Sequence, residues 1–147
     1  MNKEKTLHSI QSAIKVHETQ MDKIVAAIEG KEVKDPIAVE KTDCEFGKWL
    51  YGSDNQLRDV LGSFFYDQIE ILHVRWHSEY AKIFEILFKK QKKGFLSKIM
   101  GTPKIDEMEL DKVKLYFSEL KVTTKELLKI LGSSERRISA LPESKFS

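Results

Sequence analysis

The chain of 147 residues contains a single cysteine, Cys44, and only three prolines. One thiol cannot form a disulfide within the chain, so Cys44 is a packed small side chain, a reactive thiol or one ligand of a metal site. The sequence also lacks an apolar run of ~18 residues, which a membrane-spanning helix needs, and its N-terminus lacks a signal-peptide run. We therefore expect a cytoplasmic protein, because unpaired cysteines are normal in that reducing compartment.

Charge and motif content exclude several classes of function. The formal net charge is only +2, which is too small to indicate a nucleic-acid partner. No glycine-rich phosphate loop of the Walker type is present, and no serine, histidine and acid accompany a supporting turn motif. We predict no nucleic-acid binding.

Apolar residues recur in alternating steps of three and four, which is the pattern of amphipathic helices. Long segments with this pattern lie at about residues 7–28, 56–92 and 110–131. Gly30 and Gly132 follow the first and the last segment as C-terminal caps, and Gly62 interrupts the second. We predict an all-α fold, an antiparallel helical bundle of three long helices plus short helices that resembles a four-helix bundle.

Two shorter segments complete the organisation. Residues 31–43 lose the helical period and contain Asp35-Pro36, which favours an extended connection. The stretch CEFGKWLYG then predicts a short helix that Asp43 caps and Gly52 ends. We predict one domain over residues 1–132 and a polar, disordered tail over 133–147.

Histidines interrupt two of the apolar stripes. His73 and His77 are four residues apart, so on a helix both face the same side and can reach one metal ion. His17 replaces an aliphatic residue in the middle of the first stripe, where an unpartnered imidazole carries a desolvation penalty. His8 lies nine residues before His17, on nearly the opposite side of that helix, and is left out of the site.

Cys44 is the natural fourth member of this set. Zinc accepts three imidazoles and one thiolate at tetrahedral geometry, and the start of a helix favours a thiolate. The competing interpretation is a packed thiol beside Phe46 and Trp49, and spacing alone does not decide between the two. Among carboxylates that could accept an imidazole N–H, Glu18, Asp43 and Glu70 are close in sequence, but each is more commonly a solvated surface charge.

The run KKQKKGFLSKIMGTPK is rich in lysine. One interpretation is a basic amphipathic patch over Lys89–Lys104 that contacts an anionic membrane surface or an acidic partner. Our preferred interpretation is a solvated connection between helices.

These residues together resemble the chemoreceptor zinc-binding domain family of bacteria. That family has a histidine on its first helix, a Cys-x-Leu/Phe-Gly-x-Trp segment and a later pair of histidines four apart. Here the matching features are His17, the segment Cys44-Glu45-Phe46-Gly47-Lys48-Trp49, and His73 with His77. The resemblance covers about residues 6–90, and the cysteine segment is its most specific part.

The resemblance implies one zinc ion held by His17, Cys44, His73 and His77. It also implies a homodimer and a regulatory role, in which the domain senses zinc or oxidants such as hypochlorous acid and signals to chemotaxis or cyclic-di-GMP machinery. Four protein ligands leave no open position on zinc, so we predict a protein that is not an enzyme.

Two alternatives stay open from the residues alone. One is an iron-dependent bundle enzyme or dioxygen carrier, for which Glu70-x-x-His73 supplies one matching element but the stripes supply no second copy. The other is a metal-free helical adaptor, which would bind no zinc and would tolerate the substitution His17→Leu.

Overall fold

The computed structural model describes residues 2–52, 56–88 and 105–146, and the regular elements in these ranges are all helical. The long helices are α1 (Lys3–Ile28), α4 (Ser63–Leu87) and α6 (Glu107–Ala140). The short elements are α2 (Glu45–Leu50), α3 (Leu57–Leu61) and the 3-10 turn η2 (Glu143–Phe146). The predicted all-α bundle of three long helices is confirmed.

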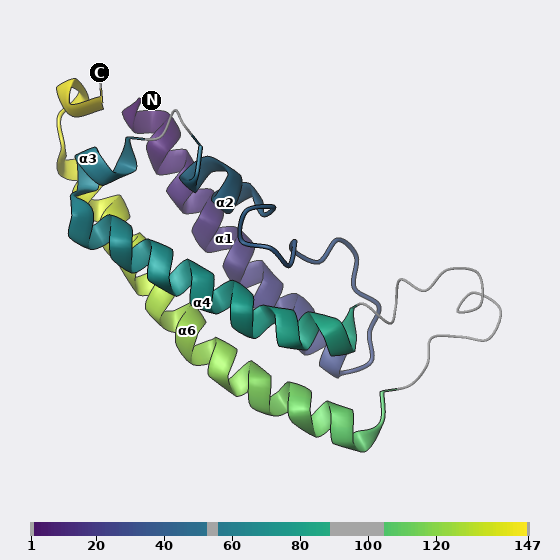
Figure 1. The fold of residues 1–147 in the computed structure, drawn as a ribbon. Helices are drawn as coiled ribbons and strands as arrows, with labels where there is room; N and C mark the ends of the chain where they lie inside the picture. The colour runs from purple at the N-terminus through teal and green to yellow at the C-terminus, as the bar shows by residue number, and fades with distance from the viewer. Residues whose placement is uncertain (1, 53–55, 89–104, 147) are drawn as a thin grey trace.

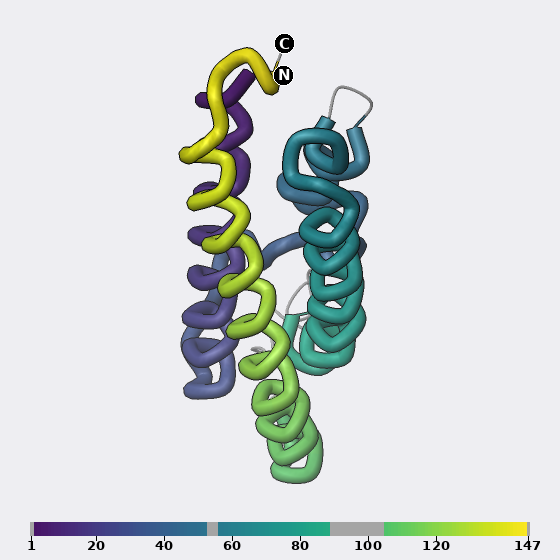
Figure 2. The backbone as a smooth tube through the Cα atoms, turned by 90° about the vertical axis from the view of Figure 1, so that its left-hand side faces the viewer, coloured from purple at the N-terminus to yellow at the C-terminus, as the bar shows by residue number. Residues whose placement is uncertain are grey.

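Helix α6 is the central element of the bundle. It packs against both α4 and α1, while α2 packs against α1. Helices α1 and α4 run in the same direction and α6 runs opposite to both, so the two ends of the chain lie at the same end of the bundle (Figures 1 and 2). None of the described helices combines the length and the apolar character that crossing a bilayer requires.

The core of the bundle forms where the apolar stripes meet. On α1, Ile10, His17 and Ile24 follow one another at steps of seven residues, and all three are fully buried. On α4, His73 and Trp76 are fully buried among aliphatic neighbours of the same stripe. Burial of each large apolar side chain contributes roughly 1.5–3 kcal/mol, so the stripes that build the bundle also carry the histidines to core depth.

Two predicted boundaries in the middle of the chain have different outcomes. The break at Gly62 is confirmed, since this residue has a φ of 93°, a left-handed conformation that glycine adopts without strain, between α3 and α4. The predicted cap at Asp43 is wrong. Cys44 is the N-cap of α2, and its own side chain accepts a hydrogen bond from the backbone N–H of Gly47.

The end of the last helix also differs from the prediction. Helix α6 continues through Gly132 to Ala140, and Ser134 and Ile138 are buried on it. The expectation of disorder is therefore wrong for residues 133–146, because an apolar residue at helical spacing still meets the core there. The division into a domain over 1–132 and a separate tail stays a prediction. The basic segment Lys89–Lys104, with its membrane-contact interpretation, lies outside the described residues.

Candidate metal centre

His17 enters the core from α1 with one ring nitrogen already engaged. Its Nδ1 lies 2.7 Å from the carbonyl oxygen of Ala13, one turn earlier on the same helix. A carbonyl can only accept, so Nδ1 carries the proton and Nε2 carries the lone pair. This Nε2 is buried and has no hydrogen-bond partner among the described residues. The imidazole therefore presents an uncompensated lone pair to the core.

His77 on α4 is arranged in the same way by a different element. Its Nδ1 lies 2.8 Å from the carbonyl oxygen of Val39, which belongs to the connection between α1 and α2. Its Nε2 is likewise buried and without a hydrogen-bond partner in the described part of the chain. The extended connection thus fixes the tautomer of a side chain on a distant helix.

His73 on α4 and Cys44 at the start of α2 contact each other. Nε2 of His73 lies 3.4 Å from Sγ of Cys44. Two ligand atoms on one tetrahedral zinc ion, with bonds of about 2.0 Å to nitrogen and 2.3 Å to sulfur, are about 3.5 Å apart. The observed separation therefore equals one edge of such a tetrahedron. A thiol donating to the imidazole gives a similar distance, so this pair alone does not identify a metal site.

The three imidazoles form one group. Each of His17, His73 and His77 offers a nitrogen, and these atoms all lie within 4.8 Å of one another. Cys44 adjoins this group through His73, and its side chain is buried. Cations prefer such convergent lone pairs, whereas the same lone pairs buried without a donor cost free energy. The donor set of three neutral nitrogens and one sulfur fits zinc.

The segment that carries Cys44 requires a glycine at position 47. A Cβ added there would lie 1.6 Å from the carbonyl oxygen of Lys41, which is far inside van der Waals contact. Without that side chain, the Lys41 carbonyl packs on α2 and also lies 3.5 Å from Sγ of Cys44. The backbone N–H of Gly47 donates to the same sulfur at 3.2 Å. The Cys-x-Phe-Gly spacing therefore allows the backbone to turn closely around the sulfur atom of Cys44.

Aromatic rings enclose the polar atoms of the site. The ring of Trp76 lies 4.6 Å from that of His17 and 5.0 Å from that of His77, centroid to centroid. The ring of Phe46 lies 5.0 Å from that of His73. These edge-to-face contacts exclude water, and a water-poor site strengthens the attraction between its donors and a cation.

Burial controls the protonation of all four side chains. Desolvation lowers the pKa of His17 to about 4, opposed by its bond to Ala13 and reinforced by His77. Burial also lowers the pKa of His73 and of His77, so all three rings are neutral near pH 7. Burial raises the pKa of the Cys44 thiol, although the N–H groups of Gly47 and Phe46 lower it. A bound divalent cation reverses that last effect, because it stabilises the thiolate directly.

The comparison with known families agrees with this geometry. The sequence profile described as the chemoreceptor zinc-binding domain matches residues 17–84 of the chain. These residues form a chemoreceptor zinc-binding domain. Domains of this family bind zinc, serve sensing or signalling and are usually non-catalytic. The comparisons with curated proteins and with solved structures found no match.

The matched range begins at His17 and includes the four side chains that the sequence selects. The structure brings His17, His73 and His77 together and sets Cys44 against His73, as the interpretation of the zinc-binding domain requires. His8 is exposed on the other side of α1, as expected. That the four side chains bind zinc in this chain is proposed below.

Sequence reasoning missed the acceptors that orient the rings of the zinc-binding domain. It considered carboxylates, whereas Nδ1 of His17 and Nδ1 of His77 contact the backbone carbonyls of Ala13 and Val39. The first could have been foreseen, because the carbonyl four residues earlier is always near a helical side chain. The second has no signal in the sequence, since the connection approaches α4 only in the folded chain.

Proposed function

We propose that this protein binds one zinc ion through His17, Cys44, His73 and His77 and acts as a regulatory sensor without catalytic activity. The observation that carries the proposal is the pair of buried, unpartnered Nε2 atoms of His17 and His77 beside the His73–Cys44 contact. Zinc in this place supplies charge that holds the sulfur as a thiolate, and it has no redox chemistry of its own.

The imidazoles and the thiol have different roles in such a site. The three imidazoles hold the ion as neutral donors that burial keeps unprotonated. Cys44 is the one donor whose chemistry a cellular oxidant can change. Because protein atoms supply all four donors, the site has no position for a substrate, which agrees with a sensor rather than a hydrolase.

Metal quantification on purified protein tests the proposal. We expect about one zinc per chain for the wild type and for His8→Ala, a histidine substitution on the same helix outside the site. We expect His17→Ala, His73→Ala, His77→Ala and Cys44→Ser each to lose most of the zinc under a competing chelator. Wild-type protein without any bound metal would contradict the proposal and leave the metal-free adaptor as the remaining function, whereas bound iron would support the iron-dependent alternative.

The sensed input is either an oxidant or the zinc level. In the first case the Cys44 thiolate attacks an oxygen of hydrogen peroxide, so an S–O bond forms, the O–O bond breaks, and hydroxide leaves while the sulfur becomes a sulfenic acid. The sulfenic acid is a weaker donor, which releases Cys44 from the site. In the second case occupancy itself carries the signal, and the affinity must lie near the free zinc concentration of the cell.

Two measurements separate these inputs. Stoichiometric peroxide releases zinc from the wild type in the first case and leaves Cys44→Ser unresponsive. A metal-buffered titration gives an affinity near the cellular free zinc level in the second. An oxidant-inert site that is always filled would exclude both.

We further propose that the protein works as a homodimer and signals to chemotaxis or cyclic-di-GMP machinery in a reducing cytoplasm. The outer face of α6 supports the dimer, because Met108, Leu115 and Val122 follow one another at steps of seven residues and are 71%, 60% and 61% exposed. In an antiparallel pair centred on Leu115, Lys112 of one copy lies near Glu119 of the other, so the flanking charges are complementary. A second copy of this chain is the occupant that we propose for this face.

Light scattering during size-exclusion chromatography tests the dimer. The wild type should have the mass of two chains, and Leu115→Glu should have the mass of one chain. Val25→Glu, which changes an exposed side chain on α1, should keep the wild-type mass. A monomeric wild type would show that the α6 face serves no second copy.

The iron-dependent alternative receives no support from the described residues. The group of potential ligands found there consists of histidines only. Glu70, the acid of the Glu-x-x-His element, is engaged with Lys41 and Tyr51 instead.

A further inference from the structure

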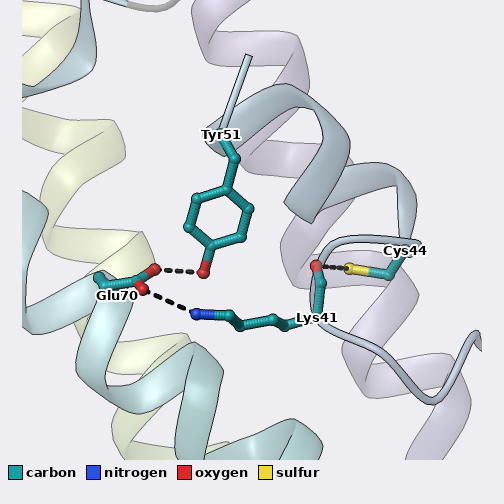
Figure 3. Close-up of polar contacts among 4 residues, drawn as sticks. All are labelled: Lys41, Cys44, Tyr51 and Glu70. Atoms are coloured by element: carbon teal, nitrogen blue, oxygen red, sulfur yellow. Dashed lines mark hydrogen bonds and ion pairs between the residues drawn. The ribbon is translucent and has the colours of Figure 1, made fainter.

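One carboxylate on α4 joins both ends of the segment that carries Cys44. Oε1 of Glu70 lies 3.2 Å from Nζ of Lys41, which precedes Cys44 by three residues. Oε2 of the same carboxylate accepts a hydrogen bond from the hydroxyl of Tyr51, which is the C-cap of α2. Figure 3 shows the two contacts converging on Glu70 from the two ends of the segment.

Lys41 connects the carboxylate to the sulfur through its own backbone. Its side chain pairs with Glu70, while its carbonyl oxygen lies 3.5 Å from Sγ of Cys44 (Figure 3). The same carbonyl oxygen packs against Gly47. The ammonium group also lies 5.0 Å from the centre of the Tyr51 ring, so the two ends of the segment contact each other. A displacement of the Lys41 backbone would therefore move the sulfur.

Helix α2 depends on such contacts because of its length. It has six residues, and isolated helices of that size are not stable in water. It packs against α1, whereas Glu70 extends from α4, the helix that carries His73 and His77. Glu70 precedes His73 by three residues, so carboxylate and imidazole share one face of α4 and point to the same segment.

We propose that Glu70 is a positioning residue, which holds the segment Lys41–Tyr51 on α4 and so keeps the sulfur of Cys44 against the imidazoles. The inference rests on the proposed function, in which Cys44 is a zinc ligand and the sensing atom. When the two contacts of Glu70 break, the segment opens with its sulfur, while the histidines stay in place on the long helices. Glu70 thereby sets how often Cys44 meets a reactant from solvent.

The first test measures the rate at which iodoacetamide alkylates Cys44 in full-length protein kept in chelator. Glu70→Gln keeps the size of the side chain and removes its charge, and we expect alkylation about tenfold faster than in the wild type. Tyr51→Phe removes one of the two contacts and should also accelerate the reaction. Because both substitutions act through one carboxylate, their combined effect should be smaller than the product of the single effects.

Asp67→Asn is the matched control. Asp67 lies one turn before Glu70 on α4 and pairs with Arg58 of α3 at 2.9 Å. The substitution Asp67→Asn therefore removes the same negative charge without removing a contact to the segment Lys41–Tyr51. Its alkylation rate should equal that of the wild type. The urea midpoints of Glu70→Gln and wild type should also agree, because the segment opens without global unfolding. Equal alkylation rates, or a faster rate explained by an equal loss of global stability, would overturn the proposal.

The second test uses cobalt(II) as a spectroscopic replacement for zinc. A thiolate bound to cobalt gives a near-ultraviolet charge-transfer band, and tetrahedral coordination gives visible bands. We expect Glu70→Gln to lower the ratio of the first to the second and Asp67→Asn to leave it unchanged, and an unchanged ratio in Glu70→Gln would overturn the positioning role. If wild type binds no metal, the proposed zinc function fails, whereas the alkylation rates still decide whether Glu70 holds the segment.

Discussion

Sγ of Cys44 lies 3.4 Å from Nε2 of His73, although 29 residues separate the two in the chain. The contact joins a two-turn helix that is unstable by itself to a long helix of the core. It is also the point where the thiol of the site meets the imidazole group. Because one member of the pair belongs to a short segment, the pair can separate while the bundle remains folded.

Replacing the sulfur with oxygen tests how much the thiolate contributes to the site. We expect Cys44→Ser to weaken zinc binding more than the tenfold to hundredfold that loss of an orienting partner typically costs. The reason is that a serine hydroxyl does not ionise near pH 7 and is a poor zinc ligand. Competition with a chromophoric chelator measures the change, and an affinity equal to that of wild type would remove Cys44 from the ligand set.

The close approach of Lys41 to α2 makes Gly47 sensitive to a single methyl group. A Cβ at this position would lie 1.6 Å from the Lys41 carbonyl oxygen, so Gly47→Ala must displace backbone. We expect a loss of about 3 kcal/mol in the free energy of unfolding and a faster reaction of Cys44 with thiol reagents. Urea denaturation and alkylation rates measure these effects.

Gly132 provides the control for that substitution. It lies inside α6, where an added Cβ meets nothing closer than the guanidinium of Arg136 at 3.6 Å. Gly132→Ala should therefore stabilise the protein by about 0.5–1 kcal/mol, because alanine favours the helix. A Gly47→Ala protein as stable as Gly132→Ala would contradict the packing described around Cys44.

The buried imidazoles predict that protein kept in chelator loses stability in acid. The pKa of His17 is about 4 in the folded state against an ordinary 6.5, so below pH 6.5 the unfolded chain binds more protons. Stability therefore falls as the pH decreases from about 6.5 towards 4, by roughly 3 kcal/mol for His17 alone. Urea unfolding at a series of pH values measures the dependence.

Substitutions at two histidines check the origin of this dependence. His17→Leu removes one of the titrating groups, so its stability should change less with pH than that of the wild type. His8→Ala, on the exposed side of α1, should keep the wild-type dependence. Identical pH profiles for His17→Leu and wild type would show that His17 is not held neutral in the fold.

A hydrogen bond beside the site links it to α6. Nε1 of Trp76, whose ring packs on His17, donates to the hydroxyl of Thr124 at 2.8 Å. Thr124→Val keeps the shape but leaves a buried N–H without its acceptor, and we expect a loss of about 1–3 kcal/mol. The exposed Ser118 donates to the carbonyl of Lys114 on its own helix, so Ser118→Ala should change stability by less than about 0.5 kcal/mol, the size of ordinary surface effects. Equal stabilities of the two variants would exclude this link.

The last turns of α6 decide whether residues 1–132 suffice for the domain. Ile138 is fully buried, so Ile138→Ala should cost about 2–5 kcal/mol, whereas Ile71→Ala on α4, where the side chain is 51% exposed, should cost little. A chain ending at residue 132 should lose at least as much stability as Ile138→Ala. If that shorter chain is as stable in urea as the full chain, the predicted boundary at 132 is correct.

The sequence by itself determined which helices form and which side chains they bury. The three-and-four spacing of apolar residues is a local property, so it predicted the long helices and placed His17 and His73 in the core, with His77 beside them, without reference to any partner. It did not predict where α6 ends, because Gly132 is tolerated inside a helix whose apolar face still meets the core beyond it.

Only the tertiary structure decided how the cysteine segment is held. The contact of Cys44 with His73, the approach of Val39 to His77 and the two contacts of Glu70 all join parts of the chain that are far apart in sequence. Such contacts depend on how a connection without helical period crosses the bundle, and periodicity says nothing about that path. The local sequence pattern therefore indicates which histidines are buried, whereas the orientation of the side chains in the site depends on the whole fold.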